Sequence, residues 1–250
     1  GCGKTTILRM IAGLEMPTSG RILIGGEDVT ERSAAERDVS MVFQSYALFP
    51  HLGVLENVRY GLVVSGVPKP EADARARAAL ETVGLAGMEA RLPSELSGGQ
   101  QQRVAVARAL VLEPSVLLFD EPLSNLDARL RRQMREEIRE LQQRLGLTVV
   151  YVTHDQAEAL AVSDRIIVMN RAVIAQEGAP RELYESPRDS FVAGFMGDAS
   201  RVQGSLERID AALGEVALGP LRARVPHRDV REGPVDVAIR PEAIRIGPPR

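Results

Sequence analysis

The sequence predicts an α/β fold with parallel strands, and three stretches carry this prediction. Residues 116–119 read Val-Leu-Leu-Phe, a short apolar run that is typical of a buried parallel strand. Asp120 and Glu121 follow at its end, the edge where open α/β sheets bind ligands. Residues 1–6 and 97–99 are glycine-rich and each opens a helical pattern. The free N–H groups of such helix starts favour phosphate.

The first predicted element is a glycine-rich turn that feeds a helix. The chain begins Gly1-Cys2-Gly3-Lys4-Thr5-Thr6, the second half of a phosphate-binding loop G-x-x-x-x-G-K-[ST]. In this motif Gly3 lets the backbone close on a phosphate, Lys4 reaches the β and γ oxygens, and Thr5 offers its hydroxyl to Mg²⁺. Asp120 would supply the other half of a magnesium–nucleotide site. The first glycine of the motif is absent and the chain does not begin with Met, so we expect a fragment.

The next elements lead to a loop of unusual composition. Residues 21–24 alternate as a short strand, and residues 39–43 form a second apolar strand that ends at Gln44. Residues 45–51 are aromatic and apolar where a loop is normally polar, which indicates a surface for a partner. Residues 55–95 are predicted to form a mainly helical insert, because residues 71–83 are Ala-rich and prolines punctuate the segment.

A long amphipathic helix follows Asp127 and ends at Gly146. Its apolar positions recur at steps of three or four: Leu130, Met134, Ile138, Leu141 and Leu145. Residues 148–152 are a β-branched strand, and His154 stands just past its end. Further strands are expected at 166–169 and 173–175, and short helices at 181–185 and 190–196.

The character of the chain changes near residue 199. Short alternating segments broken by Gly and Pro appear at 201–206, 215–218, 221–225 and 235–240. This pattern predicts the start of a small β-barrel. We expect that barrel to be incomplete at residue 250, with open strand edges.

Composition excludes several classes of function. The 250 residues carry a net charge of −3, and 26% of them are charged, as in an ordinary soluble protein. The arginines of residues 129–139 alternate with glutamates, which is typical of a solvated helix face, so we expect no nucleic-acid partner. No apolar run approaches the ~20 residues of a membrane span. Cys2 is the only cysteine, so no internal disulfide is possible and a reducing compartment fits.

Two motifs together resemble those of ABC-type ATPases. Leu96-Ser97-Gly98-Gly99-Gln100 is similar to the family's signature motif, and Asp120-Glu121 after an apolar strand is similar to its Walker B motif. The resemblance implies a P-loop NTPase core with a helical subdomain: an ABC-type ATPase domain over residues 1–197, with the subdomain at about 46–110. Residues 238–242, Ala-Ile-Arg-Pro-Glu, resemble the accessory barrel of one importer subgroup, which implies a partial TOBE-like domain over residues 198–250.

The resemblance also implies roles for individual residues. Glu121 would be the general base, His154 would sense the γ-phosphate, and Gln44 would position water. Mg²⁺ would be held by Thr5, Gln44 and Asp120. Contacts to ATP would come from Gly1, Cys2, Gly3, Lys4, Thr5, Thr6, Gln44, Ser97, Gly98, Gly99, Gln100, Asp120 and Asp127.

The family's assembly implies several partners. Two ATPase subunits would pack head to tail, with the signature of one completing the site of the other. Separate transmembrane permease subunits would anchor them at the cytoplasmic face of the inner membrane, and a periplasmic or extracellular solute-binding protein would act indirectly.

The resemblance leaves the cargo open. Residues 41–51, 124–127 and 195–199 are similar to ferric-ion importer ATPases, and Asn125 departs with them from the more general Ser-Ala-Leu-Asp. Importers of polyamines, sugars or phosphonates remain alternatives. A DNA-repair or translation ATPase is disfavoured by the short helical insert and the single nucleotide unit with a barrel. An exporter half is disfavoured by the β-rich tail.

Overall fold

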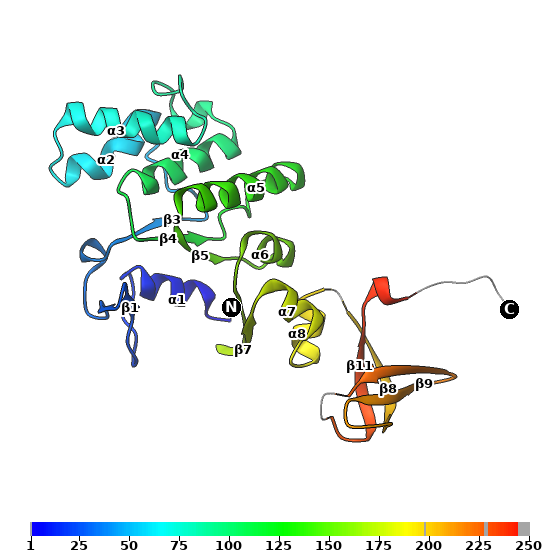
Figure 1. Ribbon diagram of the computed structural model, residues 1–250. Coiled ribbons are helices and arrows are strands. Elements are labelled where there is room, and N and C mark those ends of the chain that lie inside the picture. The colour runs from blue at the N-terminus through cyan, green and yellow to red at the C-terminus, as the bar shows by residue number, and fades with distance from the viewer. Residues whose placement is uncertain (1, 198, 228–229, 245–250) are drawn as a thin grey trace. The chain divides into compact units, whose positions relative to one another are not determined.

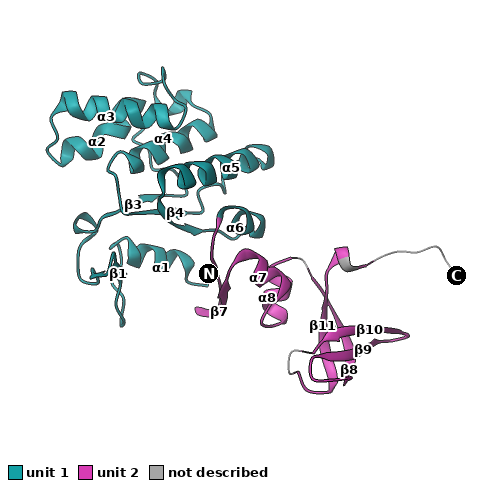
Figure 2. Cartoon of the chain, in the orientation of Figure 1, with its two compact units in different colours: residues 1–162 teal, residues 163–250 magenta. Residues whose placement is uncertain are grey.

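The computed structural model describes residues 2–197, 199–227 and 230–244 (Figure 1). Two compact units divide the chain, Gly1–Val162 and Ser163–Arg250 (Figure 2). We call them unit 1 and unit 2, and each is described by itself.

A three-stranded parallel sheet forms the centre of unit 1. Its strand order is β3-β4-β5, namely β3 (Val39–Val42), β4 (Val116–Asp120) and β5 (Thr148–Val152). The register pairs Val116 with both Val39 and Thr148, so the three strands end together at one edge. Leu117, Leu118 and Phe119 are buried, as the apolar run requires. The parallel pairing expected from the sequence is therefore confirmed.

Helices cover both faces of this sheet (Figure 1). Because successive side chains of a strand point to opposite faces, Leu118 packs with Leu8 of α1 (Lys4–Ile11), whereas Leu117 and Phe119 face the other way. On that second face lie α4 (Gly98–Leu110) and α5 (Ala128–Leu145), which contribute Ala105, Val106, Met134 and Ile138 to the core. The carboxyl ends of β3, β4 and β5, which we call the sheet edge, thus lie between the starts of α1 and α5.

A second core in unit 1 is wholly helical. Two helices, α2 (Val54–Val64) and α3 (Lys69–Thr82), pack on each other and on α4. Ala and Leu side chains fill the contact, among them Leu62, Ala76 and Leu80. The predicted helical character of residues 55–95 is confirmed, and a 3₁₀ turn, Pro93–Glu95, precedes the signature.

The strand expected at residues 21–24 is shorter than predicted. Only β1 (Leu23–Ile24) forms, and it pairs antiparallel with β2 (Glu27–Asp28). Gly25 and Gly26 both have positive φ, 60° and 87°, which suits the two-residue turn of a tight hairpin. Because Leu23 is exposed, burial does not extend the strand further. Unit 1 ends with α6 (Gln156–Val162).

Unit 2 begins with a hairpin and two short helices. The hairpin joins β6 (Ile166–Asn170) to β7 (Val173–Gly178), and the helices are α7 (Pro180–Glu185) and α8 (Ser190–Phe195). All four elements were expected near these positions.

The rest of unit 2 is an antiparallel sheet with strand order β10-β9-β8-β11. Its strands are β8 (Ser200–Arg208), β9 (Leu213–Leu218), β10 (Leu221–Pro226) and β11 (Gly233–Ile239). They coincide with the four alternating segments of the sequence. Closure of this sheet into a barrel stays a prediction. So does the domain boundary at 197/198, which falls between α8 and β8, whereas the compact units divide at 162/163.

Candidate active site

The start of α1 is shaped to receive an anion. Gly3 caps the helix with φ 90° and ψ 2°, a left-handed conformation that favours glycine. The first turn contains no acidic residue, and Thr5 and Thr6 are exposed there. The first N–H groups of a helix lack intrahelical acceptors, so they point at whatever ligand lies in front of them. Lys4 Nζ lies 3.4 Å from Cys2 Sγ, while Gly1 lies outside the described residues.

A hydrogen bond joins this helix start to the end of β4. Thr5 Oγ1 donates to Asp120 Oδ1 at 3.1 Å, although the two residues are 115 positions apart. The structure thus brings together the two predicted halves of the magnesium–nucleotide site. A hydroxyl and a carboxylate are hard oxygen donors that suit Mg²⁺, which takes few protein ligands and shares the rest with phosphates and water. The described residues contain no cluster of three or more His, Cys, Asp and Glu that could hold a metal ion by itself.

Glu121 and His154 form a second pair at the same edge. Glu121 Oε2 lies 2.9 Å from His154 Nδ1, and an ionised Glu121 accepts from an Nδ1–H. Glu121 has φ 45°, an uncommon conformation for a non-glycine residue, and its N–H donates to Val152 O at 2.9 Å. The His154 side chain is 68% exposed and Glu121 is 23% exposed. The carboxylate is therefore held in place by its backbone, and the imidazole remains open to solvent.

Gln44 follows β3 and is held through its backbone. Its carbonyl oxygen accepts from Asn125 Nδ2 at 2.9 Å, and its side chain is exposed. Since β3, β4 and β5 end together, Gln44, Asp120, Glu121 and His154 stand along one edge of the sheet. The contact from Asn125 was missed by sequence reasoning. Its only signal was the departure of this position from Ser-Ala-Leu-Asp.

The signature residues form the start of α4. Ser97 Oγ accepts from Gln100 N at 3.4 Å, and Gln100 Oε1 accepts from Ser97 N at 2.9 Å, which is a reciprocal capping box. A Cβ on Gly99 would come within 3.1 Å of Leu130, so the glycine permits close packing of α5. A Cβ on Gly98 would likewise lie 3.2 Å from Leu126, so both signature glycines pack closely against apolar side chains that follow β4.

Asp127 caps α5. Its Oδ1 accepts from the backbone N–H groups of Arg129 and Leu130, both at 3.0 Å. The side chain of Asp127 therefore has a structural task within the chain, and its expected contact across a dimer stays a prediction.

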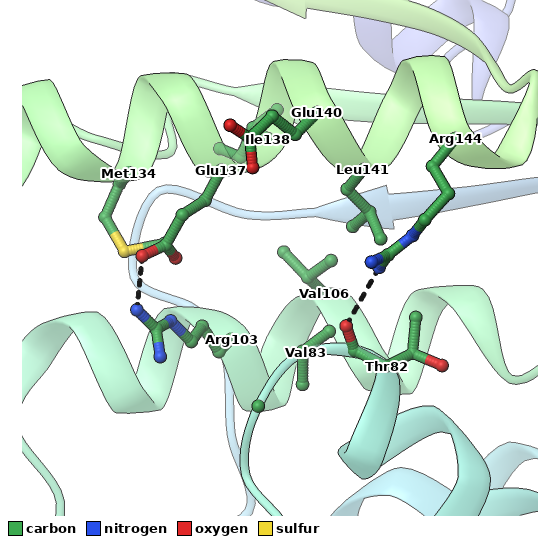
Figure 3. Close-up of a pocket in the computed structure, with 11 residues that line it drawn as sticks. Thr82, Val83, Arg103, Val106, Met134, Glu137, Ile138, Glu140, Leu141 and Arg144 are labelled. Carbon is green, nitrogen blue, oxygen red and sulfur yellow. Dashed lines mark hydrogen bonds and ion pairs between the residues drawn. The ribbon is translucent and has the colours of Figure 1, made fainter.

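A cavity of about 240 Å³ lies away from these residues, between the end of α3, α4 and α5 (Figure 3). Arg103 and Glu137 form an ion pair of 2.5 Å beside it, and Arg144 donates to Thr82 O at 3.1 Å. None of the residues predicted for the nucleotide site lines this cavity. The candidate active site lies at the carboxyl ends of β3, β4 and β5, apart from the residues that line this cavity.

A family model described as ABC transporter matches residues 1–124. The chain is 66% identical over 248 residues to the Fe(3+) ions import ATP-binding protein FbpC 1 of Rhizobium meliloti (strain 1021), covering 99% of this chain and 70% of that protein. It is 66% identical over 250 residues to FbpC of Brucella melitensis biotype 1, with 99% and 70% covered. It is 58% identical over 246 residues to FbpC 1 of Haemophilus influenzae, with 98% and 74% covered.

Proposed function

Because the chain belongs to the family of ABC transporter ATP-binding proteins, we propose that it is the ATP-hydrolysing subunit of a ferric-iron importer. The hydrogen bond between Thr5 and Asp120 carries the ATPase part of this proposal, since it joins a phosphate-binding helix start to a carboxylate at a sheet edge. The cargo rests on the relatives, whose names specify Fe(3+) import at 58–66% identity.

The start of α1 binds the phosphates in this proposal. The N–H groups of the first turn and the ammonium of Lys4 would bind the β and γ oxygens of ATP, together with Cys2, Gly3 and Thr6. Thr5, Asp120 and the amide of Gln44 would hold Mg²⁺, which neutralises charge on the phosphate oxygens.

Glu121 is the proposed general base. Its carboxylate accepts a proton from the water that attacks the γ-phosphate, and the hydrogen bonds of its backbone keep the side chain in position. His154 is hydrogen-bonded to this carboxylate and 68% exposed, so its imidazole is free to turn to a phosphate oxygen. We assign it the role of the γ-phosphate sensor.

Two subunits, packed head to tail, complete the site. The signature residues Ser97, Gly98, Gly99 and Gln100 open α4 with no acidic residue in the first turn, so this helix start favours an anion. The side chains of Ser97 and Gln100 close on each other's backbone, and in this proposal the signature of a second copy meets the Thr5–Asp120 pair. Asp127 then lies at the contact between the subunits.

The loop after Gln44 is the proposed contact with the permease subunits. The Phe49 ring packs against the Tyr60 ring in a tilted arrangement, with centroids 4.6 Å apart and an interplanar angle of 43°. Tyr60, Val63 and Val64 of α2 are exposed. Exposed apolar groups of this kind mark a protein contact. No helix among the described residues is both long and apolar enough to cross a membrane. With separate permease subunits as its membrane anchor, the proposed position of the subunit is peripheral, at the cytoplasmic face of the inner membrane, with a solute-binding protein acting on the opposite side.

The test is ATP hydrolysis by the protein reconstituted with its permease subunits in liposomes. We expect a binding protein loaded with Fe³⁺ to stimulate phosphate release, and the same binding protein without iron to serve as the control. Stimulation by a polyamine, sugar or phosphonate system and not by iron would contradict the cargo. Absence of any magnesium-dependent hydrolysis would contradict the ATPase assignment itself.

A further inference from the structure

We propose that Arg108 and Asn125 are positioning residues that hold the backbone of residues 44–47 and thereby place the Gln44 side chain for hydrolysis. This inference rests on the proposed function, in which the Gln44 amide would bind Mg²⁺ and position water. Neither Arg108 nor Asn125 touches the nucleotide in this scheme, because both act on the loop that carries Gln44.

Three carbonyl groups in this short loop are bound by the two side chains. Asn125 Nδ2 donates to Gln44 O at 2.9 Å. Arg108 Nη2 donates to Tyr46 O at 2.8 Å, and Arg108 Nη1 donates to Ala47 O at 2.7 Å. The guanidinium also lies 5.7 Å from the centroid of the Phe49 ring. These hydrogen bonds hold the loop backbone at residue 44 and again at residues 46 and 47.

The conformation of the loop explains why it needs such contacts. Tyr46 has φ 62° and Ala47 has φ 48°, so two successive non-glycine residues are left-handed. Residues in this region cost free energy and persist only where their surroundings impose the conformation. The fork of Arg108 matches two neighbouring carbonyls at once, which a lysine ammonium does less well.

The side chain of Tyr46 gives the loop a separate anchor. It is 5% exposed and packs in the core with Ala105, Val106 and Ala109 of α4. Burial raises the pKa of the Tyr46 phenol. Because this apolar contact does not depend on Arg108 or Asn125, removal of either side chain should loosen the backbone of the loop and leave the fold intact.

The two donors come from elements that carry other parts of the proposed site. Arg108 lies on α4, the helix that begins at the signature, and Asn125 lies between Glu121 and Asp127. The position of Gln44 is therefore tied to the signature helix and to the loop after the catalytic carboxylate. Loss of the Arg108 or Asn125 side chain should lower kcat for ATP and raise the Mg²⁺ requirement, with the KM for ATP little changed.

The experiment compares N125A, N125D and R108A with the unaltered protein in its complex. N125D is nearly isosteric with asparagine but lacks the donor. We expect kcat to fall about fivefold in both Asn125 variants and about twentyfold in R108A, which loses two charge-assisted bonds. R108K should recover part of that loss. R75A is the matched control, since Arg75 makes the same kind of bond to Val111 O elsewhere, and it should leave kcat unchanged.

A double-mutant cycle separates positioning from a general structural effect. In a Q44A background, N125A should lower kcat no further, because the group that Asn125 positions is already gone. Equal losses in both backgrounds would overturn the inference.

Amide hydrogen exchange gives a readout that needs no ATPase activity. We expect faster exchange at residues 44–49 in N125A and R108A, with the rest of unit 1 unchanged. Unchanged exchange there would overturn the inference even in an active enzyme. If the unaltered protein hydrolysed no ATP, the proposed function would fail. The exchange result would still show whether Arg108 and Asn125 hold the backbone of residues 44–47.

Discussion

Each unit contains a polar cluster built from residues far apart in sequence, and the two clusters differ in what their polar groups face. In unit 1 the pairs Thr5–Asp120 and Glu121–His154 stand at the open edge of a sheet, and the His154 ring is largely exposed. In unit 2 the cluster consists of Tyr184, Arg240 and Glu242, and its bonds join elements of the same unit, although Glu242 is exposed.

The cluster of unit 2 connects the helices to the sheet through hydrogen bonds. Arg240 follows β11 and donates to Met196 O at 3.1 Å and to Tyr184 O, while its guanidinium lies 3.7 Å from the Tyr184 ring centroid. Tyr184 Oη donates to Glu242. Residues 240–242, singled out in the sequence as Arg-Pro-Glu, thus join the strand to α7 and α8.

The comparison separates polar groups that remain available to a ligand from polar groups that are used in structural contacts. Arg240 has donors on two backbone carbonyls and its face on a ring, which leaves little for a ligand. The edge of unit 1 keeps a hydroxyl, a carboxylate and an imidazole within reach of solvent. Substitutions in the first cluster should therefore change catalysis, and substitutions in the second should change the stability of unit 2.

The largest effect is expected for E121Q, which replaces the proposed base by an amide of the same shape. Steady-state ATP hydrolysis should fall by about 10³-fold, because an amide cannot accept the proton of the attacking water. ATP binding, measured by fluorescence of a labelled nucleotide, should remain. E207Q, an exposed change on β8, is the control. Hydrolysis that survived E121Q unchanged would refute the assignment.

A smaller effect is expected for T5A at the same edge. The Mg²⁺ concentration that half-saturates hydrolysis should rise about tenfold, because one hard oxygen donor beside Asp120 is lost. T5S keeps the hydroxyl and should behave like the unaltered protein. A titration of hydrolysis against Mg²⁺ that was identical in T5A and T5S would remove Thr5 from the metal site.

In unit 2, G197A should lower the free energy of unfolding by about 1–3 kcal/mol without changing hydrolysis per folded molecule. Gly197 has φ 152°, and a Cβ there would overlap Arg240 Nη1 and come within 2.7 Å of Tyr184. G219A is the control for backbone strain alone, because Gly219 has φ 61° with no atom near its Cβ position. Equal losses in the two variants, measured by denaturant unfolding, would show that the cluster does not fill this space.

The smallest effect is a pH dependence of the Tyr184–Glu242 contact. The hydrogen bond from Tyr184 lowers the pKa of Glu242, so its contribution to stability is present above the ordinary glutamate pKa and is lost as the pH falls through the lowered value. The same bond raises the pKa of Tyr184, so that contribution is fully present below the ordinary tyrosine pKa and is lost as the pH rises through the raised value. In E242Q, the midpoint of unit 2 unfolding should fall less steeply as the pH is lowered. A midpoint that fell as steeply in E242Q as in the unaltered protein would show that this bond does not contribute.

Local features of unit 1 were predictable because local sequence determines them. The apolar run at residues 116–119, the glycine at position 3 and the Ser97–Gln100 capping box each act within a few residues, and the structure has the strand and both helix starts. The strand at residues 21–24 was overestimated, since alternation alone does not supply a partner to bury it.

The sequence specifies the element types, the order of the motifs and the residue types available for phosphate and magnesium chemistry. Which of these residues meet depends on the tertiary structure. The pairing of Thr5 with Asp120, of Glu121 with His154, and of Gln44 with Asn125 depends on strand order and helix packing, which act between residues 33 to 115 positions apart. A periodic pattern specifies the face of an element and not the neighbour on it, which is why Arg108 and Asn125 emerged only from the fold.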